Sequence, residues 1–448
     1  MRWQPQAQGR VSPIWGSISR QYVGTTRHIS GDSGVAALRS HIVVASLVAA
    51  LAMAPVAPEA GNILFLAAGA VAILLLRGGD QNAIQRPSVW MPLLGLVFLG
   101  LAYTLSSGAA GLVGLMFVVP LAATLLLIAA ARRSDLQPAL VGLLALCGVA
   151  GSAAIAIAEF TTTGTPRVGI WVANPIHFAD LSLSVAFLAL VGTVLGRSLD
   201  RWLFIATPLL ATVAVLLSGT RGAVVALAIM AGTAVITSVA VGLITLRKLA
   251  IGVVVLAAVL PAAWFAGIGQ TSGVQRVVAD VADVFRTGLP TDESTVLRLQ
   301  MYEGGLNAFL ASPLYGHGPF AFVEAAASRA STPFEGAPHL HNDLADFAAS
   351  GGILGLAAYM LFLWAPLVEA LRAPNTSHRA GLVIVSSTLV VGYFVMGLTN
   401  AMFGILNLTV FYAAATLVVA LLAQNGERPE RERPSEGSDG SPQLAPVP

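Results

Sequence analysis

The residues Pro338-His339-Leu340-His341-Asn342-Asp343 stand near the end of the one long polar interval of this chain, which runs from Gly269 to Gly351. On both sides of it the sequence consists of apolar runs of about 20 residues, the length at which an α-helix crosses a bilayer. The interval therefore separates a large group of expected membrane spans from a small one. If the protein carries out chemistry, we expect this interval to supply at least half of the site.

The composition predicts a polytopic helical membrane protein. The chain has 448 residues, of which 56% are hydrophobic and 10% are charged, whereas a soluble protein carries about 25% charged residues. Continuous apolar runs exclude a transmembrane β-barrel, whose strands show short alternating segments. The net charge of +2 is too small to indicate a nucleic-acid partner. The single cysteine, Cys147, lies within an apolar run and is expected to be a small buried residue.

We expect about twelve transmembrane helices, so the predicted fold class is all-α. The expected spans are 41–58, 62–76, 88–105, 111–131, 138–159, 175–195, 202–218, 221–244, 249–268, 352–371, 380–399 and 403–423. No secretory signal is expected before the first of them. The predicted organisation is an N-terminal tail over 1–40, the first nine spans within 41–268, a loop over 269–351, the last three spans within 352–424 and a disordered tail over 425–448.

The basic residues predict how these spans are oriented, because Lys and Arg favour the cytoplasmic side of short loops. They occur in both tails and in every second connection, at Arg2, Arg10, Arg20, Arg27, Arg39, Arg77, Arg86, Arg132, Arg133, Arg197, Arg201, Arg247, Lys248, Arg372, Arg379, Arg428, Arg431 and Arg433. Both termini should therefore be cytoplasmic, and the interval 269–351 should face the opposite side. Arg167 and Arg221 fall on that opposite side, where the rule disfavours them, and are candidates for function.

Two amphipathic helices are expected inside the long interval, because apolar residues recur there at helical spacing. They comprise Val274, Val277, Val278, Val281, Val284 and Phe285 in the first, and Leu299, Tyr302, Leu306, Phe309 and Leu310 in the second. We expect both helices to lie over the membrane domain. The Gly and Pro residues of 312–319 predict a turn after the second helix.

An anion site is predicted at Arg221, which opens a span in the stretch Ser218-Gly219-Thr220-Arg221-Gly222-Ala223. The free amides of a helix N-terminus together with a guanidinium suit a phosphate group. The alternative is an arginine that extends to the lipid headgroups. Arg298 on the second amphipathic helix would lie on the same side of the membrane, and two arginines can hold a pyrophosphate bidentately. Arg167 is expected to add a third positive charge.

The two histidines of the opening stretch are predicted to lie on a loop that enters a helix, because Asn342 and Asp343 favour N-cap positions. A neutral imidazole there can take a proton from an attacking hydroxyl. Two alternatives stay open at this point. His339 and His341 are either exposed loop residues, or they form a metal site with Asp343 and Asp346.

Taken together, these motifs resemble the O-antigen ligase and O-antigen polymerase superfamily over about residues 165–365. The resemblance rests on their order and spacing: Asn174-Pro175-Ile176, then Ser218-Gly219-Thr220-Arg221-Gly222-Ala223, then Arg298, Pro313, Gly316 and Gly318, then His339-Leu340-His341-Asn342 leading to Gly352-Ile353-Leu354-Gly355. Tyr302 stands where the family more often has Trp. An aromatic side chain is kept, so the expectation is unchanged.

The resemblance implies an all-α, GT-C-like membrane protein of the bacterial inner membrane, with a periplasmic helical loop and a periplasmic active site. It further implies a metal-independent glycosyltransferase without a cofactor, whose donor is a glycan on undecaprenyl pyrophosphate. The acceptor is a sugar hydroxyl of lipid A-core in the ligase branch, which we favour, and a second lipid-linked repeat in the polymerase branch. Membrane lipids are the other expected partners.

Carried over by position, the resemblance gives each candidate residue a role. Arg221 and Arg298 would bind the donor pyrophosphate and stabilise its leaving charge. His341 would act as the base on the acceptor hydroxyl, with His339 in support. The alternatives to a ligase or polymerase are a protein O-oligosaccharyltransferase and a transporter. A transporter is disfavoured because the notable charges gather at one face, whereas transport requires ionisable residues near the middle of the membrane.

Overall fold

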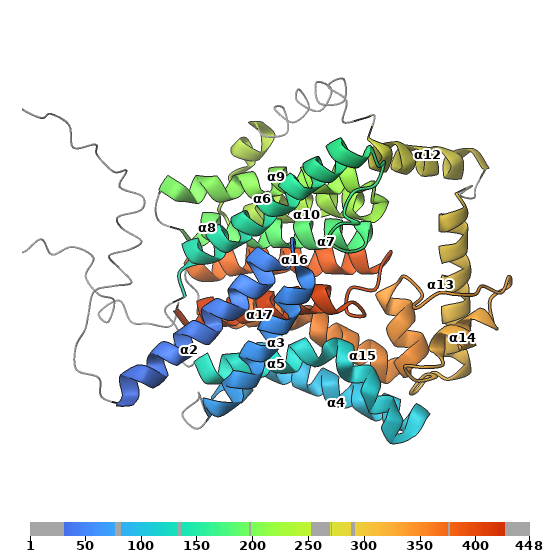
Figure 1. Cartoon of the computed structure of the whole chain (residues 1–448), viewed down its shortest axis with the longest axis horizontal. Helices are drawn as coiled ribbons and strands as arrows, with labels where there is room; N and C mark the ends of the chain where they lie inside the picture. Colours follow the sequence, from blue (N-terminus) through green and yellow to red (C-terminus); the bar gives the residue numbers. More distant parts are fainter. Residues whose placement is uncertain are drawn as a thin grey trace, which may run out of the picture.

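The computed structural model describes residues 31–76, 82–131, 136–196, 199–251, 269, 271–287, 292–374 and 377–425. Within these ranges the chain is helical and contains no strand, as the predicted all-α class requires (Figure 1). The α-helices are α2 (Gly31–Leu47), α3 (Pro58–Leu74), α4 (Pro87–Ser107), α5 (Val119–Ala131), α6 (Pro138–Thr163), α7 (Pro175–Leu188), α8 (Leu190–Leu195), α9 (Ala206–Ser218), α10 (Arg221–Ala240), α12 (Ser272–Thr287), α13 (Glu293–Ala311), α14 (Phe322–Ala327), α15 (Asp343–Arg372), α16 (Ser377–Gly397) and α17 (Leu406–Asn425). Shorter helical segments of other types are η1 (Val48–Met53), η3 (Ala83–Gln85), η4 (Gly108–Val118) and η5 (Leu199–Ile205).

Eight stretches of the described residues are long and apolar enough to cross a membrane, and α3 and Trp202–Ser218 are shorter apolar helices. The expected spans 88–105 and 111–131 fall in one apolar stretch, Pro87–Ala131. This stretch folds back at Gly108, whose backbone φ of 63° is one that glycine adopts without strain, and η4 packs against α4. The expected span 249–268 lies outside the described residues except for 249–251.

Proline marks the start of four of these helices, at Pro58, Pro87, Pro138 and Pro175. Its fixed φ suits the first helical position, and its missing N–H would have no partner there. At α7 the preceding Asn174 accepts a hydrogen bond from the Ile176 backbone N–H at 2.9 Å. The Asn-Pro-Ile motif is therefore a helix start.

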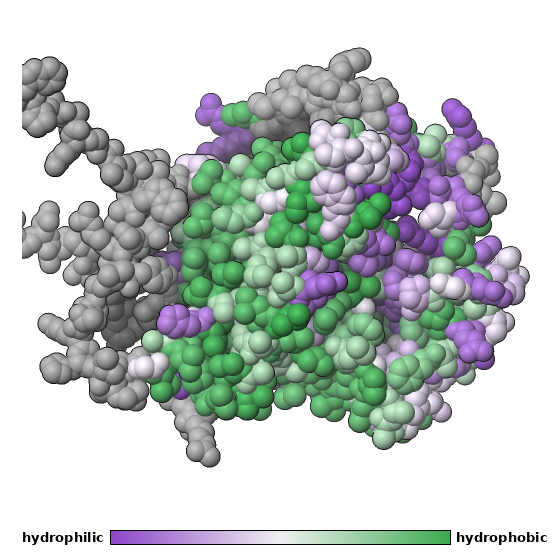
Figure 2. All heavy atoms as spheres, viewed as in Figure 1, coloured by the Kyte–Doolittle hydropathy of each residue, from purple (hydrophilic) through white to green (hydrophobic). Residues whose placement is uncertain are grey.

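The spans run side by side, and α12, α13 and α14 cover one end of the bundle (Figure 1). The first turn of α2 lies at the other end in the same view. Hydrophilic side chains gather at the end formed by α12 to α14, and apolar ones cover the middle (Figure 2). The polar interval thus forms a cap on the bundle, and helices are present at both predicted places, as α12 and α13. Only α12 is amphipathic as predicted, because Leu299, Leu306 and Leu310 of the apolar set expected for α13 are exposed.

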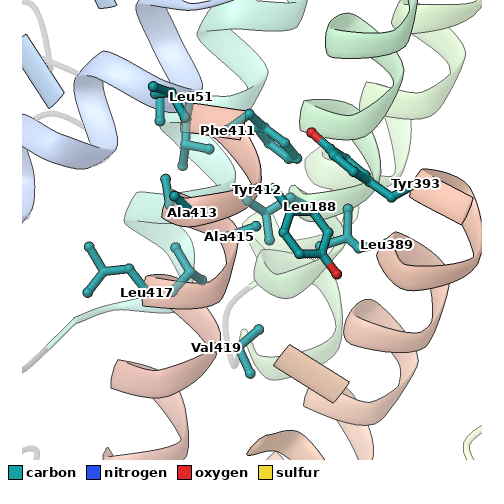
Figure 3. Packing of buried hydrophobic residues seen from close by; sticks show 14 of the residues in the cluster. Leu51, Leu188, Leu389, Tyr393, Phe411, Tyr412, Ala413, Ala415, Leu417 and Val419 are labelled. Atoms are coloured by element: carbon teal, nitrogen blue, oxygen red, sulfur yellow. The ribbon is translucent and has the colours of Figure 1, made fainter. Parts of the chain in front are cut away.

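The centre of the bundle is built around α17, which is almost wholly buried (Figure 3). Tyr412 of α17 packs on Tyr393 of α16 with ring centroids 4.3 Å apart, and on Phe403 at 5.1 Å. The hydroxyl of Tyr393 donates to the Leu408 carbonyl at 2.8 Å, and that of Tyr412 donates to the Leu363 carbonyl. These aromatic side chains join the last three spans and satisfy their polar atoms within the core.

One prediction about packing was wrong. Cys147 of α6 is exposed, although the apolar run around it was expected to bury the side chain. A helix in a membrane is apolar on every side, because lipid is its solvent. Local composition therefore does not distinguish the lipid-facing side of α6 from the side that packs on other helices.

A backbone break shapes the helix that follows the histidine loop. Within α15, Gly352 has a φ of 61° and interrupts the helix. The turn at 313–318 pairs with the groups that the break exposes: the His317 N–H donates to the Ala349 carbonyl at 2.9 Å, and the Ile353 N–H donates to the Pro313 carbonyl at 2.8 Å. The predicted turn therefore supports a short helix, Asp343 to Gly351, that carries the histidine loop at its start.

At the opposite end of the bundle a buried ion pair joins three spans. Glu369 of α15 pairs with Arg86 and accepts hydrogen bonds from the Ser88 N–H at 3.0 Å and the Ser88 hydroxyl at 2.9 Å. Arg86 also donates to the Ala420 carbonyl of α17 at 2.9 Å. Removing one member of such a pair leaves the other charge buried without its partner.

Glu369→Ala should therefore lower the free energy of unfolding by about 3 kcal/mol or more. Glu369→Gln should cost less, because its amide oxygen still accepts from Ser88. Thermal unfolding of the purified protein in detergent measures both, with the exposed Glu335→Ala as the matched control. Equal melting temperatures for Glu369→Ala and the control would contradict a stabilising role.

Candidate active site

A cavity of about 240 Å³ lies where α10, α12 and α13 meet the histidine loop. Its lining residues are Arg167, Ile176, Gly219, Thr220, Arg221, Gly222, Arg276, Ser294, Leu297, Arg298, Met301, His341 and Thr399. Four of the five predicted site residues are thus brought together, although they come from segments far apart in the sequence. The fifth, His339, touches His341, and their ring centroids are 4.2 Å apart.

Arg221 begins α10 and is held by two carboxylates of the polar interval. Its Nη1 donates to Asp280 of α12, and its Nη2 donates to Asp292 just before α13, both at 2.7 Å. Asp292 also caps α13 by accepting from the Thr295 N–H at 3.0 Å. The hydrogen bond from Arg221 is the main reason why the pKa of Asp292 lies below its usual range. These contacts fix the plane of the guanidinium and leave three of its five N–H groups for a ligand.

The other arginines of the cavity have no carboxylate partner within the residues that the structure describes. Arg167 donates only to the Ser218 carbonyl, at 3.4 Å. Burial, and then the positive charges of Arg276, Arg298 and Arg221, lower the pKa of Arg167 below its usual range. Arg276, Arg298 and Arg221 therefore lie close enough to Arg167 to repel its charge.

The charges around the cavity leave an excess of positive charge. Four arginines line it, and two aspartates are paired with one of them, so two positive charges stay uncompensated. Guanidinium groups bind phosphate through planar, paired N–H donors. A diphosphate that is esterified at both ends carries two negative charges, which matches this excess.

Residues 206–360 match the family model described as O-antigen ligase. This match supports a relationship to the O-antigen ligase superfamily. The matched region runs from the start of α9 into α15 and contains Arg221, Arg298 and His341, whereas Arg167 lies before it. Comparison with curated proteins finds no match for the chain.

The match supports, in general terms, a glycosyltransferase of the ligase or polymerase kind. It also agrees with the multi-pass architecture, since the family belongs to the bacterial inner membrane. Arg221, Arg298 and His341, which come from three separate motifs of the matched region, all line the cavity.

The backbone of the matched region holds His341 in an unusual conformation. His341 has a backbone φ of 53°, a value that residues other than glycine rarely adopt. The Leu340 N–H on one side donates to Asp346 Oδ1 at 2.7 Å, and Leu340 itself is fully buried. The Tyr302 hydroxyl donates its one hydrogen to the Leu398 carbonyl at 2.8 Å and shares it with the His341 carbonyl at 3.3 Å. Strain of this kind persists only where its surroundings enforce it, and it is frequent at functional sites.

Asn342 completes this turn, because its side chain accepts from the Ala345 N–H at 3.2 Å and caps α15. The prediction of a loop entering a helix at Asn342 is therefore confirmed. The first alternative for the two histidines, that both are freely exposed, is wrong, since His339 and His341 are each partly buried.

Both histidines are held neutral, but they differ in their hydrogen bonds. The backbone N–H of His341 donates to the ring nitrogen Nδ1 of His339 at 3.1 Å, so Nδ1 of His339 carries no proton. Burial, and then the charges of His341, His177 and Arg298, lower the pKa of His339 to about 3. Burial and then Arg298 lower the pKa of His341. His341 lines the cavity, whereas His339 supports it from outside.

The carboxylates near the histidines turn away from them. Asp346 accepts from the Leu340 backbone, and Asp343 Oδ1 accepts from the Phe403 N–H at 3.3 Å. Among the described residues, no three His, Cys, Asp or Glu side chains are grouped as metal ligands. The acidic residues that the sequence placed beside the histidines instead shape the backbone.

The sequence did not single out three residues of the site: Arg276, Asp280 and Asp292. Arg276 and Asp280 lie four positions apart on α12, and helical spacing alone places them on one face. That signal was available, but the apolar residues of the same helix indicated only a cap over the bundle. The pairing of Arg221 with Asp280 could not be predicted from the residues around Arg221, since Asp280 is 59 positions away in the sequence.

Asp346→Ala should lower kcat about 10- to 100-fold with little change in the KM for the donor. The substitution removes the acceptor of the Leu340 N–H, and with it a contact that holds the backbone turn of His341 in place. Asp346→Asn should retain most of the activity, since its amide oxygen can still accept from Leu340. Tyr302→Phe tests the same turn from the other side. Steady-state kinetics on protein of unchanged melting temperature measures these effects. A wild-type kcat in Asp346→Ala would contradict the positioning role.

Proposed function

We propose that this protein transfers a glycan from undecaprenyl pyrophosphate to a sugar hydroxyl of lipid A-core. The observation that carries the proposal is the cavity itself. It joins two guanidinium groups and one neutral imidazole, Arg221, Arg298 and His341, which the chain brings from three separate segments. The family match over 206–360 supports a reaction of this general kind.

In the proposed reaction the donor diphosphate binds to Arg221 and Arg298, with Arg167 adding charge. The acceptor hydroxyl gives its proton to His341, and its oxygen forms a bond to the anomeric carbon of the glycan. The bond between that carbon and the phosphate oxygen breaks, and undecaprenyl pyrophosphate leaves with the electron pair. The arginines stabilise the charge that develops on the leaving oxygen.

Two features of the site fit these roles. The lowered pKa of His341 keeps the imidazole unprotonated near neutral pH, as a base must be before it reacts. The guanidinium of Arg221 is already oriented by Asp280 and Asp292, so little reorganisation is needed when the diphosphate binds. We further propose that guanidinium groups replace the metal ion that other diphosphate chemistry uses. Full activity in a chelator is the expected result.

The proposal places the reaction at the periplasmic face, with both termini in the cytoplasm. The distribution of Lys and Arg supports this orientation. The first turn of α2 also lies at the end of the bundle away from α12 and α13 (Figure 1). Labelling of single introduced cysteines from outside intact cells shows which end of the bundle faces the periplasm. A cysteine introduced in α14 should react, and one introduced at 244–246 should not.

A polymerase is the second candidate, because the same family match and the same cavity serve both reactions. The two enzymes differ in the acceptor. Reconstitution with a lipid-linked glycan, and with either lipid A-core or a second donor molecule, separates them. We expect a single-step product on lipid A-core. A ladder on the undecaprenyl carrier would favour the polymerase, a product on protein would favour an O-oligosaccharyltransferase, and uptake into sealed vesicles without a covalent product would favour a transporter.

A further inference from the structure

We propose that Arg276 of α12 is a further ligand of the donor diphosphate, so that α12 forms one wall of the binding site. The inference rests on the proposed function and extends it to a residue outside the motifs that suggested it. It is argued from the placement of α12, from the partners of Arg276 and from the charge of the cavity.

One face of α12 is fixed against the cavity. Gly273, Arg276 and Asp280 follow one another at helical spacing. A Cβ at Gly273 would stand 3.4 Å from the Cα of Gly219, so the two backbones are in close contact beside Arg221. One turn beyond Arg276, Asp280 is bound to Arg221 at 2.7 Å. Arg276 is therefore held between two fixed points and lines the cavity.

The opposite side of α12 is apolar and exposed. Val278 and Val281 are each 50% exposed and Phe285 is 87% exposed. The sequence predicted that this apolar side would lie over the bundle, but in the structure it faces outward. Instead α12 presents a cation and a carboxylate to the cavity. The inward side of α12 therefore supplies the charged groups of this wall.

Arg276 has no ion pair within the described part of the chain, although Asp280 lies one turn away on the same helix. Asp280 is engaged by Arg221 instead. A partly buried guanidinium among other guanidiniums is unfavourable unless an anion joins it. The uncompensated charge of the cavity equals that of a diphosphate diester only when Arg276 is included, so Arg276 completes the charge match with the proposed donor.

The test compares three variants of the full-length protein in nanodiscs: Arg276→Ala, Arg276→Lys and the control Arg286→Ala. Arg286 lies on α12 outside the cavity and is exposed, so its loss changes the net charge of the helix equally. Arg276→Ala should raise the KM for the lipid-linked donor about 10- to 100-fold, with a much smaller change in kcat. Arg276→Lys should recover part of the affinity, and Arg286→Ala should equal the wild type.

A second measurement uses undecaprenyl pyrophosphate without its glycan, in a binding assay that needs no turnover. Its Kd should rise in Arg276→Ala in parallel with the donor KM, and the difference should shrink at high salt. If the wild type transfers glycan and Arg276→Ala keeps the wild-type Kd and KM, the inference about Arg276 is wrong and the proposed function stands. If the wild type neither transfers glycan nor binds the lipid pyrophosphate, both are wrong.

Discussion

Replacing His341 by alanine should lower kcat about 10²- to 10⁴-fold, the range over which a general base contributes. The physical reason is that His341 lines the cavity as a neutral imidazole in a backbone conformation that its neighbours enforce. The measurement is single-turnover transfer from a lipid-linked donor, with binding of the donor followed separately. Donor binding should be nearly unchanged, because the diphosphate contacts are made by the arginines.

The pH dependence of the wild type provides an independent test of the same residue. Activity should fall as the pH drops through the pKa of His341, since the protonated imidazole cannot accept the hydroxyl proton. Burial and Arg298 lower this pKa, so the acidic limb should lie below the ordinary value of about 6.5. Arg298→Gln should move the limb to higher pH. His41→Ala on α2, an exposed histidine outside the cavity, serves as the control. Wild-type rates in His341→Ala would remove this residue from the mechanism.

Replacing Arg221 by lysine should lower kcat/KM about 10²-fold, although the charge is kept. The two ends of the guanidinium hold Asp280 and Asp292 at the same time. A single ammonium group cannot bridge both carboxylates in that plane and still present paired donors to a diphosphate. We expect the loss in both kcat and donor affinity, because Arg221 touches the leaving group in the ground state and in the transition state.

Arg247→Lys makes the same chemical change beyond the far end of α10, where the side chain is exposed, and should have no effect on transfer. The melting temperature of Arg221→Lys decides between a lost ligand and a lost fold. A stable protein with wild-type kcat/KM would reduce Arg221 to a general positive charge. A stable protein with the expected loss would support the planar contact.

The described architecture could be predicted from the sequence largely because membrane spans and helix starts are local signals. Apolar runs, Pro175 after Asn174, and Asn342 at the start of α15 all act through neighbouring residues. Alternating basic loops placed Arg221, Arg298 and His341 on one side of the membrane, and they line one cavity.

Other features depended on partners distant in the sequence. Arg221 binds Asp280 of a different helix, and the turn at 313–318 pairs with a break at Gly352. Cys147 shows a second limit, since an apolar run does not record which of its sides faces lipid. The pattern of α12 indicated a cover, whereas the polar residues between its valines carry the contact with the site.

The burial of α17 has a consequence for biogenesis. Among the described spans, α17 is the last to leave the ribosome, yet it occupies the middle of the finished bundle and donates from Tyr412 to the Leu363 carbonyl of α15. Until α17 has been inserted, the groove that it fills between the earlier helices stays unoccupied by protein. A nascent chain that stalls before Leu406 should be a substrate for membrane quality-control proteases, even though the four arginines of the cavity and the histidine pair have already been translated.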